Sequence, residues 1–375
     1  MLSAKRRKKD IMLRCVISGG PCSGKSSSLA RIEKVLTEHG YKVFIVPETA
    51  TELMVNGIKS SKHISKLEFQ EIVLEKQLHK EKIYDKAASY YPSDKVVIIY
   101  DRGIMDGMAY IEKKDYLKLL KKYNLTIESA RNRYDAVIHL VTVAKGDVGA
   151  YTLENNVARL ETTPEEAIKA DERTMKAWIG HPHLRVIDNS TNFDDKINRV
   201  LNEIFSLLGE DEPVEIERKF LINKPTKETL DSLEFCSKTN IIQTYLKKIK
   251  DNTERRVRQR GNDEGYNFYY TEKTHIEPGK RVEVEKKITA NEYVNLLAEA
   301  DISHHQISKT RYCFIYKDQY FELDIYPFSK EKAILEIELK DINQTIELPP
   351  YIDIVKEVTD DIDYTNYKIS EQLTL

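Results

Sequence analysis

The segment Gly19-Gly20-Pro21-Cys22-Ser23-Gly24-Lys25-Ser26 determines the fold of the first half of this chain. It matches G-x-x-x-x-G-K-[ST], follows an apolar run that predicts a strand, and opens a segment with a helical pattern, which is the context that this motif requires. Its glycines let backbone N–H groups curl around phosphate oxygens, and the start of the helix favours an anion. Lys25 is expected to reach the outer phosphates, and the Ser26 hydroxyl is placed for magnesium. The predicted nucleotide-binding residues are Gly19, Gly20, Pro21, Cys22, Ser23, Gly24, Lys25, Ser26 and Ser27.

Short apolar runs alternate with longer amphipathic segments on both sides of this loop. Strands are predicted at 12–18, 43–46, 96–100, 136–143 and 184–187, and helices at 64–89, 110–123, 164–178 and 193–208. Apolar strands separated by helices indicate a parallel sheet covered on both faces. We therefore predict a doubly wound α/β domain over residues 11–208. The charged breaker at 209–213 is the expected linker.

An acid follows one of these buried strands. Asp101 ends the run that begins at Val96, where its carboxylate is placed to hold the magnesium shell of the nucleotide. The triplet Asp101-Arg102-Gly103 resembles that of P-loop kinases of the deoxynucleoside-kinase and nicotinamide-riboside-kinase kind, over roughly residues 11–208. In that group an acid after the second strand acts as base toward the phosphoryl acceptor, which implies this role for Glu48. A carboxylate at the N-terminus of a helix is the equally open alternative for Glu48.

The same resemblance implies a lid whose arginines neutralise charge during transfer, and Arg159 and Arg173 lie in the matching stretch. Arginines on the surface of a helix are the alternative for both residues. The Asn/Thr-Lys-x-Asp motif by which many GTPases read guanine is missing, so both GTP and ATP remain candidates. The segment 188–191 could border the base or form a plain turn.

After the linker the pattern changes to period two, with short turns that are typical of antiparallel strands. Strands are predicted at 214–222, 242–249, 254–260, 266–275, 281–288, 307–316, 320–326 and 334–340, and helices at 226–233 and 290–300. Charged pairs two residues apart recur along one face of these strands. The eight acids are Glu215, Glu217, Glu283, Glu285, Glu322, Asp324, Glu336 and Glu338. The six bases are Lys219, Arg256, Arg258, Lys273, Lys309 and Arg311.

One explanation for any single strand is an amphipathic sheet whose charged face is simply solvated. Sorting of like charges onto separate strands favours a binding site instead, because carboxylates suit hard divalent cations and Arg and Lys suit phosphate oxygens. A sheet closed with this face inward would form a hydrophilic tunnel. We therefore predict an α+β domain built on a closed antiparallel barrel over residues 214–375.

The segment Glu215-Ile216-Glu217-Arg218-Lys219 resembles the Glu-x-Glu-x-Lys signature of CYTH domains, the triphosphate tunnel metalloenzymes, and the match extends over about residues 214–370. The resemblance implies that Lys219, Arg256, Arg258, Lys273 and Arg311 bind a phosphate chain. It also implies that Glu215, Glu217, Glu336 and Glu338 bind or orient magnesium or manganese. Members of this family cleave triphosphates or make cyclic AMP, with the metal polarising the phosphoryl group.

The two halves in this order resemble a eukaryotic family of channel translocation-defect proteins, which implies a regulator that binds GTP and phosphoinositide. Two functions therefore remain open. The first is a nucleotide-binding regulator of membrane-protein trafficking whose tunnel binds polyphosphate or a phosphoinositide headgroup. The second is a metal-dependent hydrolase of tripolyphosphate or nucleoside triphosphates, with a small-molecule-kinase-like first domain.

The amino-acid composition bears on three further properties: nucleic-acid binding, cysteine chemistry and membrane association. The 375 residues contain 59 Lys+Arg and 61 Asp+Glu, so no bulk positive field favours nucleic acid as a partner. The four cysteines are scattered without CxxC spacing, which favours a reducing compartment over disulfides or a zinc site. With no apolar run of membrane-spanning length, we expect a cytoplasmic protein. The basic run at 5–9 allows peripheral contact with anionic lipid or a nuclear address, or is simply solvated.

Overall fold

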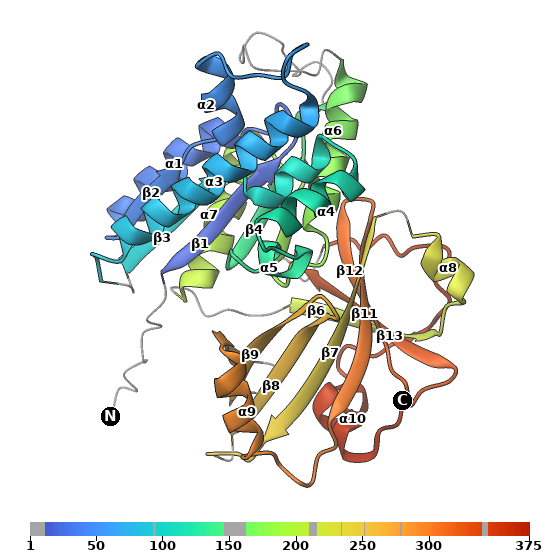
Figure 1. The fold of residues 1–375 in the computed structure, drawn as a ribbon. Helices are drawn as coiled ribbons and strands as arrows, with labels where there is room; N and C mark the ends of the chain where they lie inside the picture. Colours follow the sequence, from blue (N-terminus) through green and yellow to red (C-terminus); the bar gives the residue numbers. More distant parts are fainter. Residues whose placement is uncertain are drawn as a thin grey trace. The chain divides into compact units, whose positions relative to one another are not determined.

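The structure, a computed structural model, describes residues 12–92, 95–145, 163–209, 216–233, 235–250, 252–277, 280–339 and 344–375. Contacts divide the chain into two compact units, Met1–Asp211 and Glu212–Leu375 (Figure 1). The predicted lid residue Arg159 and the predicted metal ligand Glu215 lie outside the described residues, as does the side chain of Glu283. Within the described part of the chain, no helix is long and apolar enough to cross a membrane.

The first unit is built on a parallel sheet with the strand order β2-β3-β1-β4-β5. Its strands are β1 (Leu13–Gly19), β2 (Lys42–Val46), β3 (Val96–Asp101), β4 (Ala136–Leu140) and β5 (Leu184–Ile187). Its helices are α1 (Lys25–Glu38), α2 (Thr49–Val55), α3 (Lys66–Ala88), α4 (Lys113–Lys122), α5 (Ile127–Arg131), α6 (Pro164–Trp178) and α7 (Phe193–Leu208). The central strand β1 runs into the glycine-rich loop, and β3 and β4 flank it. The carboxyl ends of these three strands therefore meet beside that loop, which is where open α/β sheets bind their ligands.

Sequence signals explain several of these boundaries. Ser65 caps α3, since its hydroxyl accepts from the Glu68 N–H while the Glu68 side chain accepts from the Ser65 N–H. Thr163 caps α6 and Pro164 occupies its first turn. Apolar residues of α1 and α7 pack against one face of the sheet in a continuous core that includes Ile17, Ile32, Leu36, Val200 and Ile204. Burial of this face holds the strand ends in place for the site above them.

The second unit is an antiparallel sheet of nine strands with the order β10-β9-β8-β7-β11-β12-β13-β6-β14 (Figure 1). The strands are β6 (Ile216–Asn223), β7 (Cys236–Leu246), β8 (Thr253–Asn262), β9 (Gly265–Glu277), β10 (Lys280–Ile288), β11 (Ile307–Tyr316), β12 (Gln319–Ile325), β13 (Lys332–Leu339) and β14 (Ile354–Glu357). The helices are α8 (Lys227–Asp231), α9 (Ala290–Leu297) and α10 (Asn366–Gln372). Among the described residues no strand pair joins β10 to β14, so closure into a barrel remains a prediction.

The two faces of this sheet differ in chemistry. One face packs an apolar cluster that includes Phe220, Phe314, Phe321, Leu335 and Ile337. At the β8–β9 end, α9 covers the apolar face through Val257, Tyr293 and Phe268. The alternate residues of the same strands carry the charged side chains, because successive side chains of a strand point to opposite faces. The apolar face is therefore covered, and the charged face is the candidate ligand-binding face of the sheet.

Candidate functional site

The phosphate loop is closed onto itself by Lys25. Its ammonium donates to the carbonyls of Gly19 at 2.9 Å and Gly20 at 2.8 Å, and to the Ser23 hydroxyl at 3.2 Å. Burial, together with the nearby Arg102 guanidinium, lowers the pKa of Lys25 to about 8. Ser26 and Ser27 are exposed at the start of α1. A bound phosphate would offer Lys25 charged oxygens in place of these loop carbonyls. An ammonium binds charged oxygens more strongly.

The buried carboxylate of Asp171 is hydrogen-bonded to the backbone of the phosphate loop. Asp171, on α6, accepts hydrogen bonds through Oδ1 from the N–H of Gly20 at 2.8 Å and from His139 Nε2 at 3.1 Å. Burial alone would raise the pKa of Asp171, but His139 and the Gly20 N–H outweigh it and hold that pKa below its usual range. A Cβ on Gly20 would stand 2.6 Å from the Asp171 Cβ, so the loop needs glycine here. The Thr142 hydroxyl fixes the next residue by donating to the Pro21 carbonyl at 2.5 Å.

Asp101 lies at the end of β3, paired in register with Ile17 of β1. Burial and the nearby Glu48 carboxylate together raise the pKa of Asp101 to about 6. Its Oδ1 atom is buried and has no hydrogen-bond partner among the described residues. An unsatisfied carboxylate oxygen at this strand end fits the outer shell of a magnesium ion whose other protein ligand would be the Ser26 hydroxyl.

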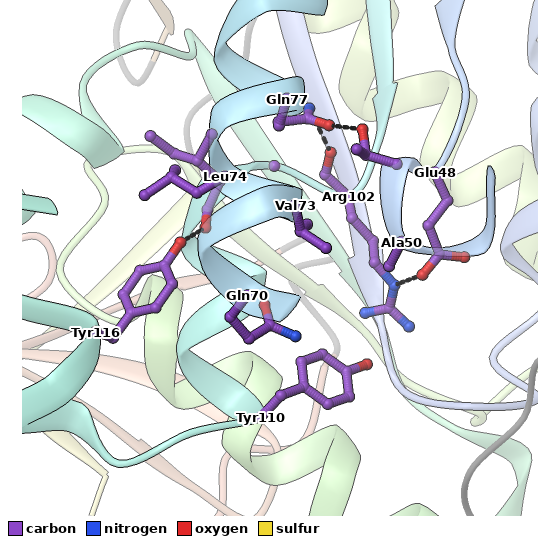
Figure 2. Close-up of a pocket in the computed structure, with 13 residues that line it drawn as sticks. Glu48, Ala50, Gln70, Val73, Leu74, Gln77, Arg102, Tyr110 and Tyr116 are labelled. Atoms are coloured by element: carbon purple, nitrogen blue, oxygen red, sulfur yellow. Dashed lines mark hydrogen bonds and ion pairs between the residues drawn. The ribbon is translucent and has the colours of Figure 1, made fainter. Parts of the chain in front are cut away.

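Glu48 and Arg102 form an ion pair beside the phosphate loop (Figure 2). Arg102 Nε donates to Glu48 Oε1 at 2.6 Å, and the Thr51 hydroxyl donates to Glu48 Oε2 at 2.9 Å. Burial would raise the pKa of Glu48, but the charges of Arg102 and Lys25 outweigh burial and lower it. Glu48 occupies the N-cap position of α2 without a side-chain cap hydrogen bond. Its carboxylate therefore faces Arg102 rather than the helix backbone.

Arg102 is held in an unusual backbone conformation, with φ of 67°. Non-glycine residues rarely adopt such angles, and functional sites are enriched in them. Asp106, in the 3-10 helix η2 (Ile104–Ala109), lies 3.6 Å from Arg102 Nη1 and is almost fully buried. It also accepts hydrogen bonds from the Ser18 hydroxyl at 2.5 Å and from Trp178 Nε1 at 3.2 Å. Asp106 thus fixes the Arg102 turn to the end of β1 and to α6.

A pocket opens beside the Glu48–Arg102 pair. Figure 2 shows α3 along one side of it, with Gln70, Val73, Leu74 and Gln77 on that helix. Gln77 accepts a hydrogen bond from the Thr49 hydroxyl and donates to the Arg102 carbonyl at 3.5 Å. The space that water can occupy in the pocket measures about 40 Å³. The lining residues are Glu48, Thr49, Ala50, Gln70, Val73, Leu74, Gln77, Arg102, Gly103, Ile104, Gly107, Tyr110 and Tyr116.

The segment 188–191 is bound to α7. Arg199 donates to Asp188 Oδ1 at 2.7 Å and to the Ser190 hydroxyl at 3.0 Å. Asn189 donates to the Thr142 carbonyl at 2.8 Å and accepts from Lys196 Nζ at 2.6 Å. Polar side chains of this segment are thus engaged in structural hydrogen bonds, which favours the turn over a base-reading role. Arg173, on α6, is exposed.

The charged face of the second unit is an ion-pair network. Arg311 donates to Asp324 at 2.7 and 2.6 Å and to Glu336 at 2.8 Å, and it also contacts Glu322. Lys219 lies 3.1 Å from Glu336 and 3.2 Å from Glu217. Burial opposes ionisation of Glu336, yet Lys219 and Arg311 hold its pKa far below the usual range. Further ion pairs join Lys309 to Asp324 and Arg258 to Glu285.

A further base lies on this face. Arg260, on the same face of β8 as Arg256 and Arg258, adds a seventh base to the six predicted ones, and six of the eight predicted acids have described side chains. Eight acids against seven bases in the sequence keep the predicted excess of acid. In the described ranges no group of three or more His, Cys, Asp and Glu could hold a metal ion. Glu336 is buried in the network, whereas Glu338 is exposed. In the described part of this face, carboxylates are paired with bases, as in the contacts of Glu336 with Lys219 and of Asp324 with Lys309 and Arg311.

Comparisons with known proteins place a P-loop nucleotide-binding domain in the first half, because residues 14–196 match the model of an AAA domain. Among solved structures, a deoxyadenosine kinase from M. mycoides with bound dATP shares 19% identity over 51% of this chain and 98% of its own, with a TM-score of 0.37. An inorganic triphosphatase shares 28% over 42% and 95%, with a TM-score of 0.30. A protein from Pyrococcus horikoshii OT3 shares 19% over 34% and 80%, with a TM-score of 0.27. No curated protein matches the sequence.

Proposed function

We propose that the first unit binds GTP or ATP with Mg²⁺ or Mn²⁺ and transfers the terminal phosphoryl group to a hydroxyl of a small molecule in the pocket. The observation that carries this proposal is the Glu48–Arg102 pair, with its 2.6 Å hydrogen bond, at the wall of a pocket beside the phosphate loop. Lys25 and Asp101 are close enough to both residues to influence their ionisation. A phosphate-binding lysine, a magnesium-shell acid, a candidate base and a pocket for the acceptor therefore share one site.

Each residue has a distinct task in this proposal. Glu48, ionised at neutral pH because its pKa is lowered, takes the proton of the acceptor hydroxyl. Arg102 orients Glu48 and neutralises charge that develops near the acceptor. Lys25 binds the outer phosphates, and Arg159 of the expected lid would add a further positive charge. The metal, held by Ser26 and Asp101, would neutralise the phosphate oxygens during transfer.

The second unit in this proposal binds a polyphosphate with a divalent cation on its charged face. Lys219, Arg256, Arg258, Lys273, Lys309 and Arg311 would bind phosphate oxygens, and Glu215, Glu217, Glu336 and Glu338 would bind or orient the metal. The support is the burial of five of these bases, with Arg258 half-buried, since buried Lys and Arg need anionic partners. Hydrolysis of tripolyphosphate or of a nucleoside triphosphate on this face is the enzymatic form of the proposal.

A regulator without phosphoryl transfer is the second candidate. The pocket beside the Glu48–Arg102 pair is small, because the centres of water molecules can occupy only about 40 Å³ of it. A regulator needs only nucleotide binding. It would bind a phosphoinositide headgroup through the same bases and contact membranes peripherally, as a regulator of membrane-protein trafficking would.

One set of incubations separates these candidates. The full chain is incubated with ATP or GTP and Mg²⁺ or Mn²⁺, with and without nucleosides and sugars, and nucleoside diphosphate is measured. Consumption that depends on an acceptor supports the kinase. Tight nucleotide binding without consumption, together with binding to vesicles that contain phosphoinositide, supports the regulator. Phosphate release from tripolyphosphate tests the hydrolase separately.

A further inference from the structure

Arg102 lies between two carboxylates of the first unit. Its Nε atom donates to Glu48 Oε1 at 2.6 Å, and its Nη1 atom lies 3.6 Å from Asp106 Oδ1 (Figure 2 shows the Glu48 contact). Nη1 is buried and makes no hydrogen bond to a described residue. A guanidinium is a planar fork that favours two parallel hydrogen bonds to one carboxylate. Arg102 is therefore shared between two acids and does not form a forked pair with Glu48.

Asp106 is fixed by donors from three separate segments. Its Oδ1 atom accepts from the Ser18 hydroxyl at 2.5 Å, and its Oδ2 atom accepts from the Gly103 N–H at 2.8 Å and from Trp178 Nε1 at 3.2 Å. Ser18 belongs to β1, Gly103 follows β3, and Trp178 ends α6. Asp106 is only 2% exposed, and a buried carboxylate needs a cationic partner. Arg102 is a cation within ion-pair distance of it.

The backbone beside Arg102 depends on the same carboxylate. Arg102 has a φ of 67°, and the N–H of the next residue, Gly103, is one of the donors to Asp106. A Cβ on Gly103 would stand 2.9 Å from the Trp178 ring, so this turn is packed against α6. Asp106 thus holds Arg102 in two ways, through the backbone turn and through the negative charge beside Nη1.

We propose that Asp106 is a positioning residue, which keeps the Arg102 guanidinium from turning onto Glu48 as a forked pair. The inference rests on the proposed phosphoryl transfer by the first unit, and it adds the residue that sets the geometry of the Glu48–Arg102 pair. Loss of the Asp106 charge would let a second N–H of Arg102 turn toward Glu48. The forked pair would neutralise more of the charge with which Glu48 takes the proton of the acceptor.

The test is a double-mutant cycle on the full chain, with acceptor-dependent formation of nucleoside diphosphate as the readout. Asp106→Asn keeps the shape of the side chain and removes its charge. It is expected to lower kcat at least about tenfold and to change KM for nucleotide and acceptor less than about threefold. In the Arg102→Gln background the same substitution is expected to change kcat less than about twofold, because the residue through which Asp106 acts is absent.

Asp135→Asn is the matched control. Asp135 accepts from the Arg14 N–H at 2.8 Å near the start of β1, so this substitution also converts an acid that accepts a backbone N–H into an amide. It is expected to leave kcat within about twofold of the wild type. Circular dichroism checks the fold of each variant. If Asp106→Asn does not fold, Trp178→Phe takes its place in the cycle, because it removes one donor to Asp106 and keeps an aromatic ring; a smaller loss of kcat is then expected.

The possible results separate this inference from the proposed function. Loss of kcat by the same factor in the wild-type and Arg102→Gln backgrounds would show that Asp106 supports only the fold, and would overturn the positioning role. Unchanged kcat in Asp106→Asn would overturn it as well, while phosphoryl transfer stands. The same two results decide for Trp178→Phe. A wild-type chain that transfers phosphate to no acceptor overturns the proposed function, and the positioning role with it.

Discussion

Asp171 accepts a 2.8 Å hydrogen bond from the backbone N–H of Gly20, so a carboxylate of α6 holds the first turn of the phosphate loop. The same oxygen accepts from His139 and, at 3.3 Å, from the Thr142 N–H. Asp171 thereby connects α6 to the phosphate loop and to β4.

Asp171→Ala should lower the free energy of unfolding of the first unit by about 2–4 kcal/mol, because it leaves buried donors of Gly20 and His139 without their acceptor. Affinity for ATP and GTP should fall as the loop loosens. The control is Glu172→Ala, whose half-buried side chain lies 3.5 Å from Lys145 and does not contact the loop. Denaturant unfolding and nucleotide titration check both effects. Equal stability of the two variants would show that the Gly20 contact is dispensable.

Lys25→Ala should abolish detectable nucleotide binding, since Lys25 is the cation placed to bind the outer phosphates. Lys34→Ala removes an equal charge from the exposed side of the same helix and should leave binding unchanged. Calorimetric titration with GTP and with ATP measures the effect, and circular dichroism checks the fold. Wild-type affinity in Lys25→Ala would exclude this loop as the nucleotide site.

The free energy of unfolding of the first unit should rise as pH increases above about 8, because of the buried Lys196. Burial lowers the pKa of Lys196 from 10.5 to about 8, with Asp171 opposing the shift. Between these values the unfolded chain holds more protons than the folded one, so stability rises with pH across that window. Relative to Lys196→Met, the wild type should gain up to about 3 kcal/mol between pH 8 and pH 10.5. Denaturant unfolding of both proteins at the two pH values measures this difference, and a constant difference would contradict the assignment.

Reversal of Arg256 and Arg258 to Glu should lower the affinity for tripolyphosphate at least about a hundredfold, because two charge-assisted contacts become repulsive. Arg258 contacts Glu285, so the reversal also adds a second carboxylate beside an existing one. Nucleotide binding by the first unit should be unchanged. The matched control reverses two exposed bases, Lys238 of β7 and Lys317 of the turn between β11 and β12. Unchanged tripolyphosphate affinity in the double reversal would mean that the charged face is only solvated.

Residue patterns predicted most of the elements in this fold. The helices α6 and α7 begin and end where the amphipathic pattern does, and the period-two pattern located seven of the nine strands of the second sheet to within about two residues at their starts. Strand β7 begins at Cys236 rather than 242, because the polar residues before Ile241 resemble a loop. The short elements β14 and α10 are missing from the prediction, since four to seven residues give little periodicity.

Site residues could be predicted from the sequence only where they belong to a motif, end a predicted strand or continue the alternation of a strand. Lys25 and Asp101 carry such signals, and Arg260 carries one too, because it continues the alternation of Arg256 and Arg258. Asp106 and Asp171 belong to neither a motif nor a strand pattern. Gln70 and Tyr110, which line the pocket, come from α3 and from the loop after η2. Strand order and helix packing bring these residues together, and a single sequence does not encode that proximity as a local pattern.

Glu48→Gln tests the central claim most directly. The substitution keeps the shape of the side chain but removes its ability to take a proton, so acceptor-dependent formation of nucleoside diphosphate should fall at least about a hundredfold. Affinity for ATP and GTP should be retained. The control is Glu52→Gln, which should keep its activity; the Glu52 carboxylate contacts Lys76 and Lys80. The contradicting result is acceptor-dependent transfer by Glu48→Gln at the wild-type rate, or a wild-type protein that binds nucleotide and transfers phosphate to no acceptor.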